Sequence, residues 1–276
     1  MVNDMVFLHL SDIHFLRRYP KASSGYNSVF NEMTNPLIKI EKSLEKVTMD
    51  EVDFIIITGD LVESGTADDY KTLKEKFEFL FKGVPYFITL GNHDNKKEFY
   101  KGWFDREDDN EPYNVVGEIK GLRIIGLDIS EYHNNDGAIS QKQCEWLREE
   151  LSKDNRIDTI LFLHHHLLRD QFNTPSVHVP NEFKNIIKES SIVSIFTGHT
   201  HHVYSGVFAG KPYFTGGSLS FAGFDESDGL VRFEDAGTIN KCEYKYGEIK
   251  VETIFGINEN KFLGYVNFRE QDNKLK

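Results

Sequence analysis

The sequence predicts an α/β fold built on a largely parallel sheet, and three observations support this prediction. Short apolar runs rich in Ile, Val and Phe recur along the chain, as expected of strands buried on both faces. Segments with helical periodicity lie between these runs, so strand and helix patterns alternate. The chain has 276 residues, 39% of them hydrophobic and 13% aromatic, which is enough for one large domain.

Five runs of strand length are each followed at once by small or polar residues. The runs cover residues 6–10, 54–57, 86–90, 159–163 and 192–196, and a further apolar run covers residues 124–127. The letters that follow the five runs are "SDIH", "TGD", "GNHD", "HHH" and "TGHTHH". Each predicted strand therefore carries polar side chains at its carboxyl end.

Two segments between the runs have clear helical signals. Residues 67–81 place Tyr70, Leu73, Phe77 and Leu80 at helical spacing, which predicts a core-facing helix and not a surface that stacks nucleic-acid bases. Ser140 and Gln143 form a capping box at the start of a second helix. The C-terminal part, about residues 203–257, predicts antiparallel hairpins at 203–215 and 242–255.

The sequence predicts one domain over residues 1–276, because no linker divides the chain. Residues 258–276 form a polar tail whose last residues we expect to fray. The net charge of −12 argues against a nucleic-acid partner. No signal peptide, membrane-spanning run or disulfide framework is evident, so we expect a soluble cytoplasmic protein without a membrane partner. Association into a homo-oligomer stays open.

The polar residues behind the strands predict a single site. Ligands of open α/β sheets bind at the carboxyl ends of the strands, where these side chains would converge. Asp12 with His14, and His199 with His201, are i, i+2 pairs expected to point the same way from extended segments. Glycines 59, 91 and 198 are expected to allow tight turns that present the next side chain. The strand-end residues are Asp12, His14, Asp60, Asn92, His93, Asp94, His164 to His166, His199 and His201.

The donor set predicts two metal ions. At least two carboxylates, four imidazoles and one amide oxygen are too many for one tetrahedral zinc ion, which takes four ligands. They suit two divalent ions that share a carboxylate bridge. Mixed nitrogen and oxygen ligation favours Mn, Fe or Zn.

The ordered blocks Asp12-Ile13-His14, Gly59-Asp60, Gly91-Asn92-His93-Asp94, the His164 segment and Gly198-His199-Thr200-His201 resemble those of the calcineurin-like metallophosphoesterases. The resemblance covers residues 5 to about 220. It implies a four-layer αββα sandwich, in which two mixed β-sheets lie between flanking helices. It also implies that Asp12, His14, Asp60 and His201 hold one metal, and that Asp60, Asn92, His164 and His199 hold the other.

The resemblance further implies a mechanism, in which a metal-bridging hydroxide attacks a phosphoryl group in line. His93 is similar to the catalytic histidine of the family, with general-acid or phosphate-binding duty, and Asp94 would orient it. His165 is a candidate for substrate contact or for support of the ligands, and a solvated loop position is the alternative. Relatives acting on phosphodiesters often read His-His-Pro-Pro where this chain reads His-His-His-Leu.

The leading functional hypothesis is a phosphodiesterase for a small soluble phosphodiester, with 3′,5′-cyclic nucleotides among the candidates. The chain looks similar to bacterial class III cyclic-nucleotide and glycerophosphodiester phosphodiesterases. The alternatives are a phosphomonoesterase or nuclease on the same metals, and a non-catalytic scaffold with this fold. Substrate specificity is expected in residues 17–28, 169–181 and 218–228, where Phe221 and Phe224 could stack a base.

Several polar residues near these motifs predict ordinary structural roles. We expect His9 in the core, His133 and His178 in surface loops, and His202 turned away from the metals. His166 is expected at the rim or in solvent, and Asp128 in a structural hydrogen bond.

Overall fold

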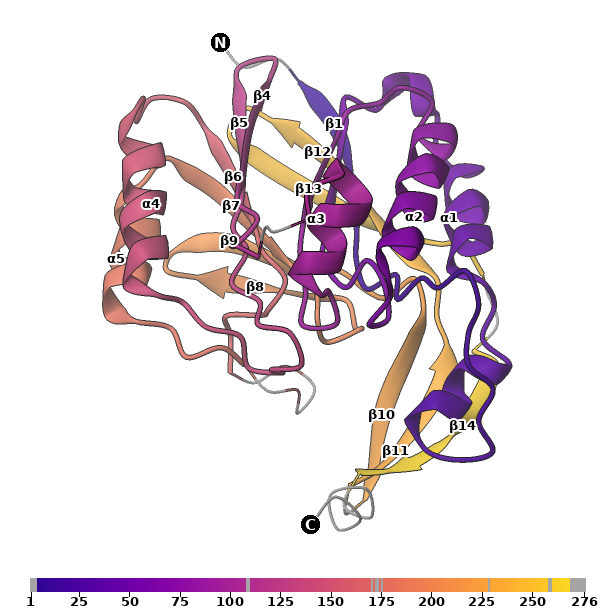
Figure 1. Cartoon of the computed structure of the whole chain (residues 1–276). Coiled ribbons are helices and arrows are strands. Elements are labelled where there is room, and N and C mark those ends of the chain that lie inside the picture. The colour runs from indigo at the N-terminus through magenta and orange to yellow at the C-terminus, as the bar shows by residue number, and fades with distance from the viewer. Residues whose placement is uncertain are drawn as a thin grey trace.

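Two mixed β-sheets face each other between two layers of helices (Figure 1). The structure is a computed structural model and describes residues 4–107, 110–169, 171, 174, 176–227, 229–257 and 260–268. The helices α1 to α3 cover one sheet, and α4 and α5 cover the other. The predicted four-layer αββα sandwich is thereby confirmed.

The first sheet has the order β13-β12-β1-β2-β3. Its central strands β1 (Met5–Leu10), β2 (Phe54–Thr58) and β3 (Tyr86–Thr89) are parallel, and Leu8 pairs with Ile55. The hairpin of β12 (Thr238–Lys245) and β13 (Glu248–Phe255) adds antiparallel to β1. The outer face packs against α1 (Pro36–Leu44), α2 (Ala67–Leu80) and α3 (Lys96–Phe104), with the short 3-10 helix η2 (Met49–Glu51) before β2.

The second sheet has the order β4-β5-β6-β7-β9-β8. Its strands are β4 (Val115–Ile119), β5 (Leu122–Gly126), β6 (Thr159–Phe162), β7 (Ile192–Thr197), β8 (Tyr204–Phe208) and β9 (Lys211–Thr215). The helices α4 (Gln141–Ser152) and α5 (Asn181–Glu189) cover its outer face.

Side chains alternate between the two faces of each buried strand, and this alternation builds the layers. In β1, Leu8 and Leu10 pack against the helices, whereas Phe7 packs between the sheets. Phe7 stacks on Phe54 with ring centroids 4.7 Å apart, and it meets Phe196 of the second sheet edge-on at 5.4 Å. A strand that is apolar on both faces fits only between two covered layers, as the continuous apolar runs predicted.

A third sheet extends from the body, and the sequence did not predict it. The strands β10 (Phe221–Ser227), β11 (Leu230–Asp235) and β14 (Phe262–Asn267) form this sheet in the order β10-β11-β14. The 3-10 helix η1 (Tyr26–Asn31) packs on it through Val29 and Phe30, and this unit, here named the arm, projects from the body (Figure 1). The prediction of a polar tail from residue 258 is wrong for residues 262–267, and residues 269–276 lie outside the described part.

Most predicted elements are confirmed to within one or two residues. The capping box of Ser140 and Gln143 starts α4, and both predicted hairpins form. The helices α1, α3 and α5 and the strand β4 were not among the predicted elements. None of the helices in the described ranges combines the length and apolar character that crossing a bilayer demands.

Candidate metal centre

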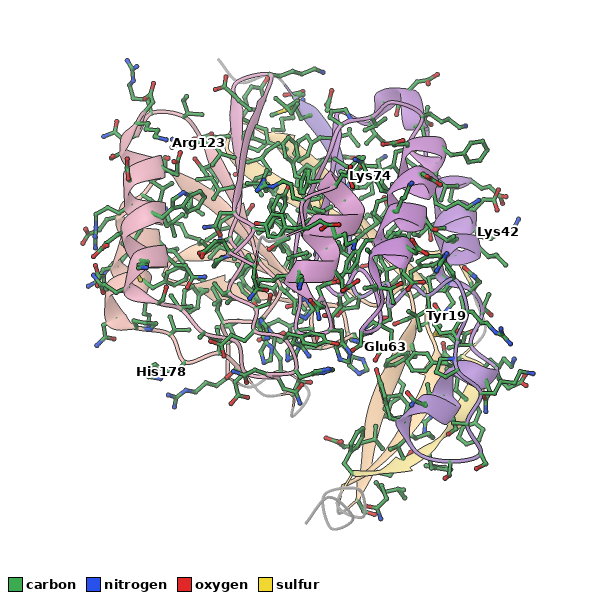
Figure 2. All side chains as sticks on the ribbon, in the orientation of Figure 1. Tyr19, Lys42, Glu63, Lys74, Arg123 and His178 are labelled. Atoms are coloured by element: carbon green, nitrogen blue, oxygen red, sulfur yellow. The ribbon has the colours of Figure 1, made fainter. Side chains whose placement is uncertain are left out.

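The carboxyl ends of strands from both sheets meet at one edge of the sandwich, next to the arm. β1, β2 and β3 of the first sheet and β6 and β7 of the second end there. The structure brings all seven predicted ligands together at this edge, in two groups. Figure 2 shows Glu63 at this lower edge of the body, and Arg123 at the opposite end of the molecule.

The first group contains Asp12, His14, Asp60 and His201, whose potential ligand atoms lie within 4.8 Å of one another. His14 Nε2 is 3.2 Å from His201 Nε2 and 3.4 Å from Asp60 Oδ2. His201 Nε2 is 3.4 Å from Asp12 Oδ1. These four side chains thus surround one point with two imidazole nitrogens and two carboxylates.

The second group contains Asp60, Asn92, His164 and His199. His164 Nε2 lies 3.1 Å from Asn92 Oδ1, 3.2 Å from His199 Nδ1 and 3.4 Å from Asp60 Oδ2. The amide nitrogen of Asn92 is 3.3 Å from Asn135 Oδ1, and this contact turns the amide oxygen of Asn92 toward His164. Asp60 Oδ2 therefore lies at the same distance from a ring nitrogen of each group.

The hydrogen-bond partners of the His14 and His201 rings indicate that the first group suits a cation. His14 Nδ1 faces the Glu63 carboxylate at 2.5 Å, and His201 Nδ1 faces the Phe221 carbonyl at 2.6 Å. Because both partners are acceptors, each Nδ1 carries the proton, and a neutral ring then has a lone pair on Nε2. The two lone pairs point at each other across 3.2 Å, which is repulsive unless a cation lies between them.

The second group has the same property. His164 Nδ1 donates to the Thr58 carbonyl at 2.7 Å, so in the neutral ring the lone pair of Nε2 faces the oxygens of Asp60 and Asn92. Burial lowers the pKa of His164, but Asp60 raises it to about 9, so these oxygens attract a positive charge to Nε2. Facing acceptors without a proton between them repel, and a divalent ion removes the repulsion. Both groups offer only nitrogen and oxygen atoms, which fits the predicted class of metals.

Five of these ligands have a left-handed backbone. The φ angle is 53° at Asp12, 47° at His14, 49° at Asp60, 74° at His199 and 60° at His201. This backbone conformation is energetically unfavourable for residues other than glycine, and such strain concentrates at functional sites. The prediction that the i, i+2 pairs leave extended segments is wrong: the chain turns sharply at each ligand. As a result, His199 joins the second group while His201 joins the first.

Glycines beside the ligands are needed for close approach more than for turning. Among residues 59, 91 and 198, only Gly59 has a positive φ, of 85°. A Cβ atom on Gly91 would lie 2.1 Å from Asp60 Oδ1, and one on Gly198 would lie 2.0 Å from Ser11 Oγ. The expected tight turns are therefore made mainly by the ligands themselves, and the glycines leave room for them.

His93 lies beside both groups, and its ring contacts Glu63, a residue that sequence reasoning missed. His93 Nδ1 is 3.0 Å from Glu63 Oε1, and the His93 backbone amide donates to Asp60 Oδ1 at 2.9 Å. Asp94 accepts hydrogen bonds from the backbone amides of Gly91 and Leu61 at 2.8 and 3.1 Å. The carboxylate hydrogen-bonded to the His93 ring is thus that of Glu63, three residues after Asp60 in "GDLVE".

The charges of this cluster shift the pKa values of its members. Burial tends to raise the pKa of Asp60, but His164, His93 and His14 outweigh it and hold that pKa well below its usual range. Burial likewise raises the pKa of Glu63, yet His93 and His14 bring it down to about 2. For His93, burial lowers the pKa, whereas Asp60 and Glu63 raise it to about 10. These two carboxylates therefore favour the imidazolium form of His93.

The other two histidines of the "HHH" run are buried. His165 and His166 have no exposed surface, so the expectation of His166 at the rim or in solvent is wrong. The His165 ring lies 4.7 Å from that of His199, and the Gly137 backbone passes so close that a Cβ atom there would be 2.8 Å from His165 Nδ1. His165 is thus covered by the loop after β5 and supports the ring of a predicted ligand.

The remaining expectations for polar residues agree with the structure. His9 is buried and contacts Thr58 Oγ1 at 2.9 Å, while His133 and His178 are exposed. His202 Nε2 faces the Gly223 carbonyl at 2.8 Å, away from both groups. Asp128 accepts hydrogen bonds from Ser130 and from the Tyr113 amide.

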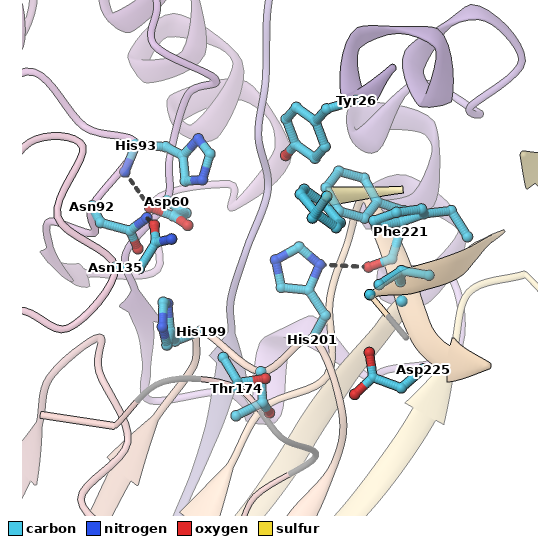
Figure 3. A pocket seen from close by; sticks show the side chains of 16 residues that line it. Tyr26, Asp60, Asn92, His93, Asn135, Thr174, His199, His201, Phe221 and Asp225 are labelled. Carbon is cyan, nitrogen blue, oxygen red and sulfur yellow. Dashed lines mark hydrogen bonds between the residues drawn. The ribbon is translucent and has the colours of Figure 1, made fainter. Parts of the chain in front are cut away.

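A pocket of about 630 Å³ opens between the metal centre and the arm (Figure 3). Asp60, Asn92, His93, His199 and His201 line one side, and Tyr26, Phe221, Gly223, Val231, Phe233 and Phe268 line the other. Each of the three loops predicted to set specificity contributes a lining residue, namely Tyr26, Thr174 and Phe221. Phe221 is only 3% exposed and packs on the His201 ring at 4.7 Å, so it is a buried wall of the pocket.

Comparison with known families agrees with this geometry. The model of the calcineurin-like phosphoesterases matches residues 5–203, which hold every predicted metal ligand. The chain belongs to the calcineurin-like phosphoesterase family. The predictions of this family and of a hydrolase of phosphoric esters are thereby confirmed. The family uses divalent metals, and the chain has a cluster suited to them.

Several bacterial phosphodiesterases are similar in sequence. A probable glycerophosphodiester phosphodiesterase of Arcobacter nitrofigilis is 29% identical over 72% of this chain and 72% of its own length. A cAMP/cGMP dual specificity phosphodiesterase of Mycobacterium tuberculosis is 29% identical over 76% of this chain and 65% of its own length. A probable cyclic nucleotide phosphodiesterase of Rhodococcus erythropolis is 31% identical over 58% of this chain and 55% of its own length.

Solved structures share the fold of this calcineurin-like phosphoesterase. A dimetal phosphatase from Danio rerio superposes with a TM-score of 0.56 at 11% identity, over 92% of this chain and 99% of that one. The family match ends at residue 203, before β10, β11 and β14. The metal groups therefore lie in the shared family region, whereas most of the arm side of the pocket lies outside it.

Proposed function

We propose that this calcineurin-like phosphoesterase is a binuclear phosphodiesterase that hydrolyses small phosphodiesters, with 3′,5′-cyclic nucleotides as the natural class. The position of Asp60 Oδ2, 3.4 Å from a ring nitrogen of each ligand group, is the observation that supports two metals with a shared carboxylate. Asp12, His14 and His201 would complete the first site, and Asn92, His164 and His199 the second. Mn, Fe or Zn suits these ligands.

Two divalent ions in these sites would supply a nucleophile from water at neutral pH and would neutralise the phosphoryl oxygens. The residues of the chain provide the geometry. Glu63 fixes the His14 ring through Nδ1, Thr58 fixes His164 and Phe221 fixes His201. Each ring thus presents one set nitrogen, which reduces the reorganisation that metal binding would otherwise require.

His93 is the proposed proton donor to the leaving alkoxide. Burial lowers its pKa, but Asp60 and Glu63 raise it to about 10 and so favour the protonated form that a proton donor needs. Its side chain lines the pocket and stands beside both metal groups. Asp94 is the proposed positioning residue, because it binds the backbone of Gly91, Leu61 and Val62 and so fixes the turn that carries Asn92 and His93.

The charge of the pocket supports a diester over a monoester. A monoester carries close to two negative charges and a diester one, so a monoester gains more from a cationic clamp. Among the described residues that line the pocket there is no lysine or arginine, and Asp225 adds a carboxylate. Arg17, five residues after Asp12 in the chain, pairs with Asp68 and Asp69.

The arm side of the pocket supports a substrate with a planar apolar group. Tyr26, Val231 and Phe268 give that side aromatic and aliphatic surface, and the Tyr26 ring lies 6.3 Å from the His93 ring. Aromatic side chains stack well on nucleobases. Relatives named as cyclic nucleotide phosphodiesterases point to the same substrate class.

The test is a comparison of three substrates with Mn²⁺-loaded protein: bis(p-nitrophenyl) phosphate, p-nitrophenyl phosphate and cyclic AMP or cyclic GMP. We expect kcat/KM for the aryl diester to exceed that for the monoester by about tenfold or more, a difference of about 1.4 kcal/mol. Equal or faster turnover of the monoester would assign the protein to the phosphatases of the family. Turnover of glycerophosphodiesters but not of cyclic nucleotides would contradict the nucleotide class.

The compartment belongs to the proposal as well. Cys144 and Cys242 are both buried and free, which supports a reducing compartment such as the cytoplasm.

A further inference from the structure

A fully buried lysine lies at the base of the arm. Lys39 of α1 has no exposed surface, and its Nζ donates to Asp235 Oδ1 and to the Ser220 carbonyl. Asp235 is itself only 3% exposed and accepts a second hydrogen bond, from the Thr34 amide at 3.1 Å. Buried charges need such partners, because an unpaired ammonium or carboxylate away from water is very costly.

The ion pair ties the helical layer to both strands that form the wall of the pocket. Asp235 is the last residue of β11, and Ser220 immediately precedes β10. Lys39 belongs to α1, which packs on the outer face of the first sheet. The pair therefore sits where β10 and β11 leave the body (Figure 1).

Residues 218–221 connect this ion pair to two candidate metal ligands. Ser218 Oγ contacts Ser220 Oγ at 2.8 Å and donates to the Asp12 carbonyl at 3.1 Å. The Phe221 carbonyl accepts from His201 Nδ1 at 2.6 Å, as Figure 3 shows. One short segment thus lies between Lys39 on one side and Asp12 and His201 on the other.

Stability alone does not explain why the pair is charged. Well-packed apolar residues of similar volume often replace a buried ion pair without loss of stability. An ion pair differs from them because it fixes direction: here Nζ must point at both Asp235 and the Ser220 carbonyl. That requirement fixes the base of β10 and β11 relative to α1.

We propose that Lys39 and Asp235 are positioning residues that hold the arm wall of the pocket in register with the metal centre. The inference rests on the proposed phosphodiesterase function, because it assigns the pair control over a substrate that contacts both walls. Gly223, Val231 and Phe233 on the arm would then keep a set distance from Asn92 and His93. A small diester that reaches only the metals would depend on the pair much less.

The decisive variant is K39M/D235L, which leaves no buried charge behind, and K42M is its matched control. Lys42 lies on the same helix and is half exposed, in a pair with Glu45. Three measurements apply to the full-length protein: hydrogen exchange of the arm, metal content by elemental analysis, and kinetics. The kinetics compare a cyclic nucleotide with glycerophosphoethanolamine, a diester without a planar or aromatic group that could contact the arm.

We expect K39M/D235L to exchange faster in β10 and β11 while β2 and β6 keep wild-type protection. Its kcat/KM for the cyclic nucleotide should fall by about ten- to a hundredfold, mostly through KM, as expected for misplaced binding groups. The small diester should change less than about threefold. K42M should match wild type in every measurement.

Wild-type exchange and kinetics in K39M/D235L would overturn the proposal, and so would equal losses with both diesters. If that variant does not fold, S218A replaces it, because Ser218 joins Ser220, the partner of Lys39, to the Asp12 carbonyl. The proposal then requires faster exchange in β10 and β11 and a raised KM for the cyclic nucleotide at wild-type metal content, and wild-type exchange and KM overturn it. Lack of diesterase activity in the wild type would refute the proposed function, whereas hydrogen exchange and metal content would still decide the role of the pair.

Discussion

Glu63→Gln isolates the residue that links the metal centre to His93. One carboxylate oxygen of Glu63 accepts from His14 Nδ1 at 2.5 Å, and the other accepts from His93 Nδ1 at 3.0 Å. Glutamine keeps the shape but offers one acceptor oxygen and one donor amide. Only one of the two rings can therefore keep its hydrogen bond.

The size of the effect follows from these contacts. A hydrogen bond to a charged group contributes about 1.5–3 kcal/mol, which corresponds to roughly 10- to 150-fold. The shorter contact, with His14, is the one expected to survive, although a neutral amide supports a metal-binding ring less well than a carboxylate. Loss of such outer-shell partners usually costs about 10- to 100-fold in metal affinity or activity. We expect a fall in kcat/KM within that range.

The pH profile gives a second, independent measurement. Glu63 is one of the groups that raise the pKa of His93 to about 10. A proton donor is active below its pKa, so activity is lost as the pH rises through that value. Removal of the Glu63 charge lowers the pKa of His93, and the alkaline limb of the profile should move to lower pH.

The assay combines metal titration with kcat/KM from pH 6 to 10 for wild type and Glu63→Gln. Asp68→Asn is the matched control, because it removes one charge from an exposed neighbour paired with Arg17. Wild-type metal affinity together with an unmoved alkaline limb in Glu63→Gln would refute the reasoning.

Three further predictions concern the metal content, His93 and the buried His9. Elemental analysis should find about two metal ions per wild-type chain. Asp60→Asn should lose both ions, because Asp60 Oδ2 lies close to both ligand groups. A single ion that is unaffected by Asp60→Asn would contradict a shared carboxylate. His93→Ala should retain the metals but lose about 10²–10⁴-fold in kcat for esters with poor leaving groups. The loss should be smaller for p-nitrophenyl esters, whose leaving group barely needs protonation. Loss of the metals on elemental analysis would instead assign His93 to the metal site. Burial lowers the pKa of His9 to about 3, so this group contributes stability above its unfolded pKa of 6.5 that is lost as the pH falls toward 3. Between pH 6.5 and 5 the loss from His9 is about 1.6 kcal/mol. Urea unfolding with a chelator present should therefore show a fall in stability over this range that is larger in wild type than in His9→Gln by about that amount.

The sequence located the metal ligands because strand ends are local features. Each apolar run ends at a residue whose neighbours are polar, and the parallel arrangement brings those ends to one edge. Asp12, Asp60 and His164 could therefore be placed together before any contact was known. The same local signals gave the start of α4 and both hairpins, since capping boxes and turns act within a few residues.

The sequence also carried a weaker signal for Glu63, which could have been found. It stands three residues after Asp60, and a carboxylate near several histidines is a frequent partner of a metal-bound ring. Nothing in "GDLVE", however, states which way its side chain turns. The tertiary structure sets that direction, and it places Glu63 between His14 and His93.

By itself, then, the sequence indicated the family, the layer order and a set of candidate ligands. The candidates follow from polar residues at the ends of apolar runs, and the family and layer order follow from the resemblance of the ordered motif blocks. Tertiary structure alone decided the arm, because β14 pairs with β11 some thirty residues earlier in the chain and its apolar residues have no periodic pattern of their own. It also decided that His166 is buried and that Lys39 lies beside Asp235. Burial and partnership depend on segments far apart in the chain, and no local preference encodes which of them will meet.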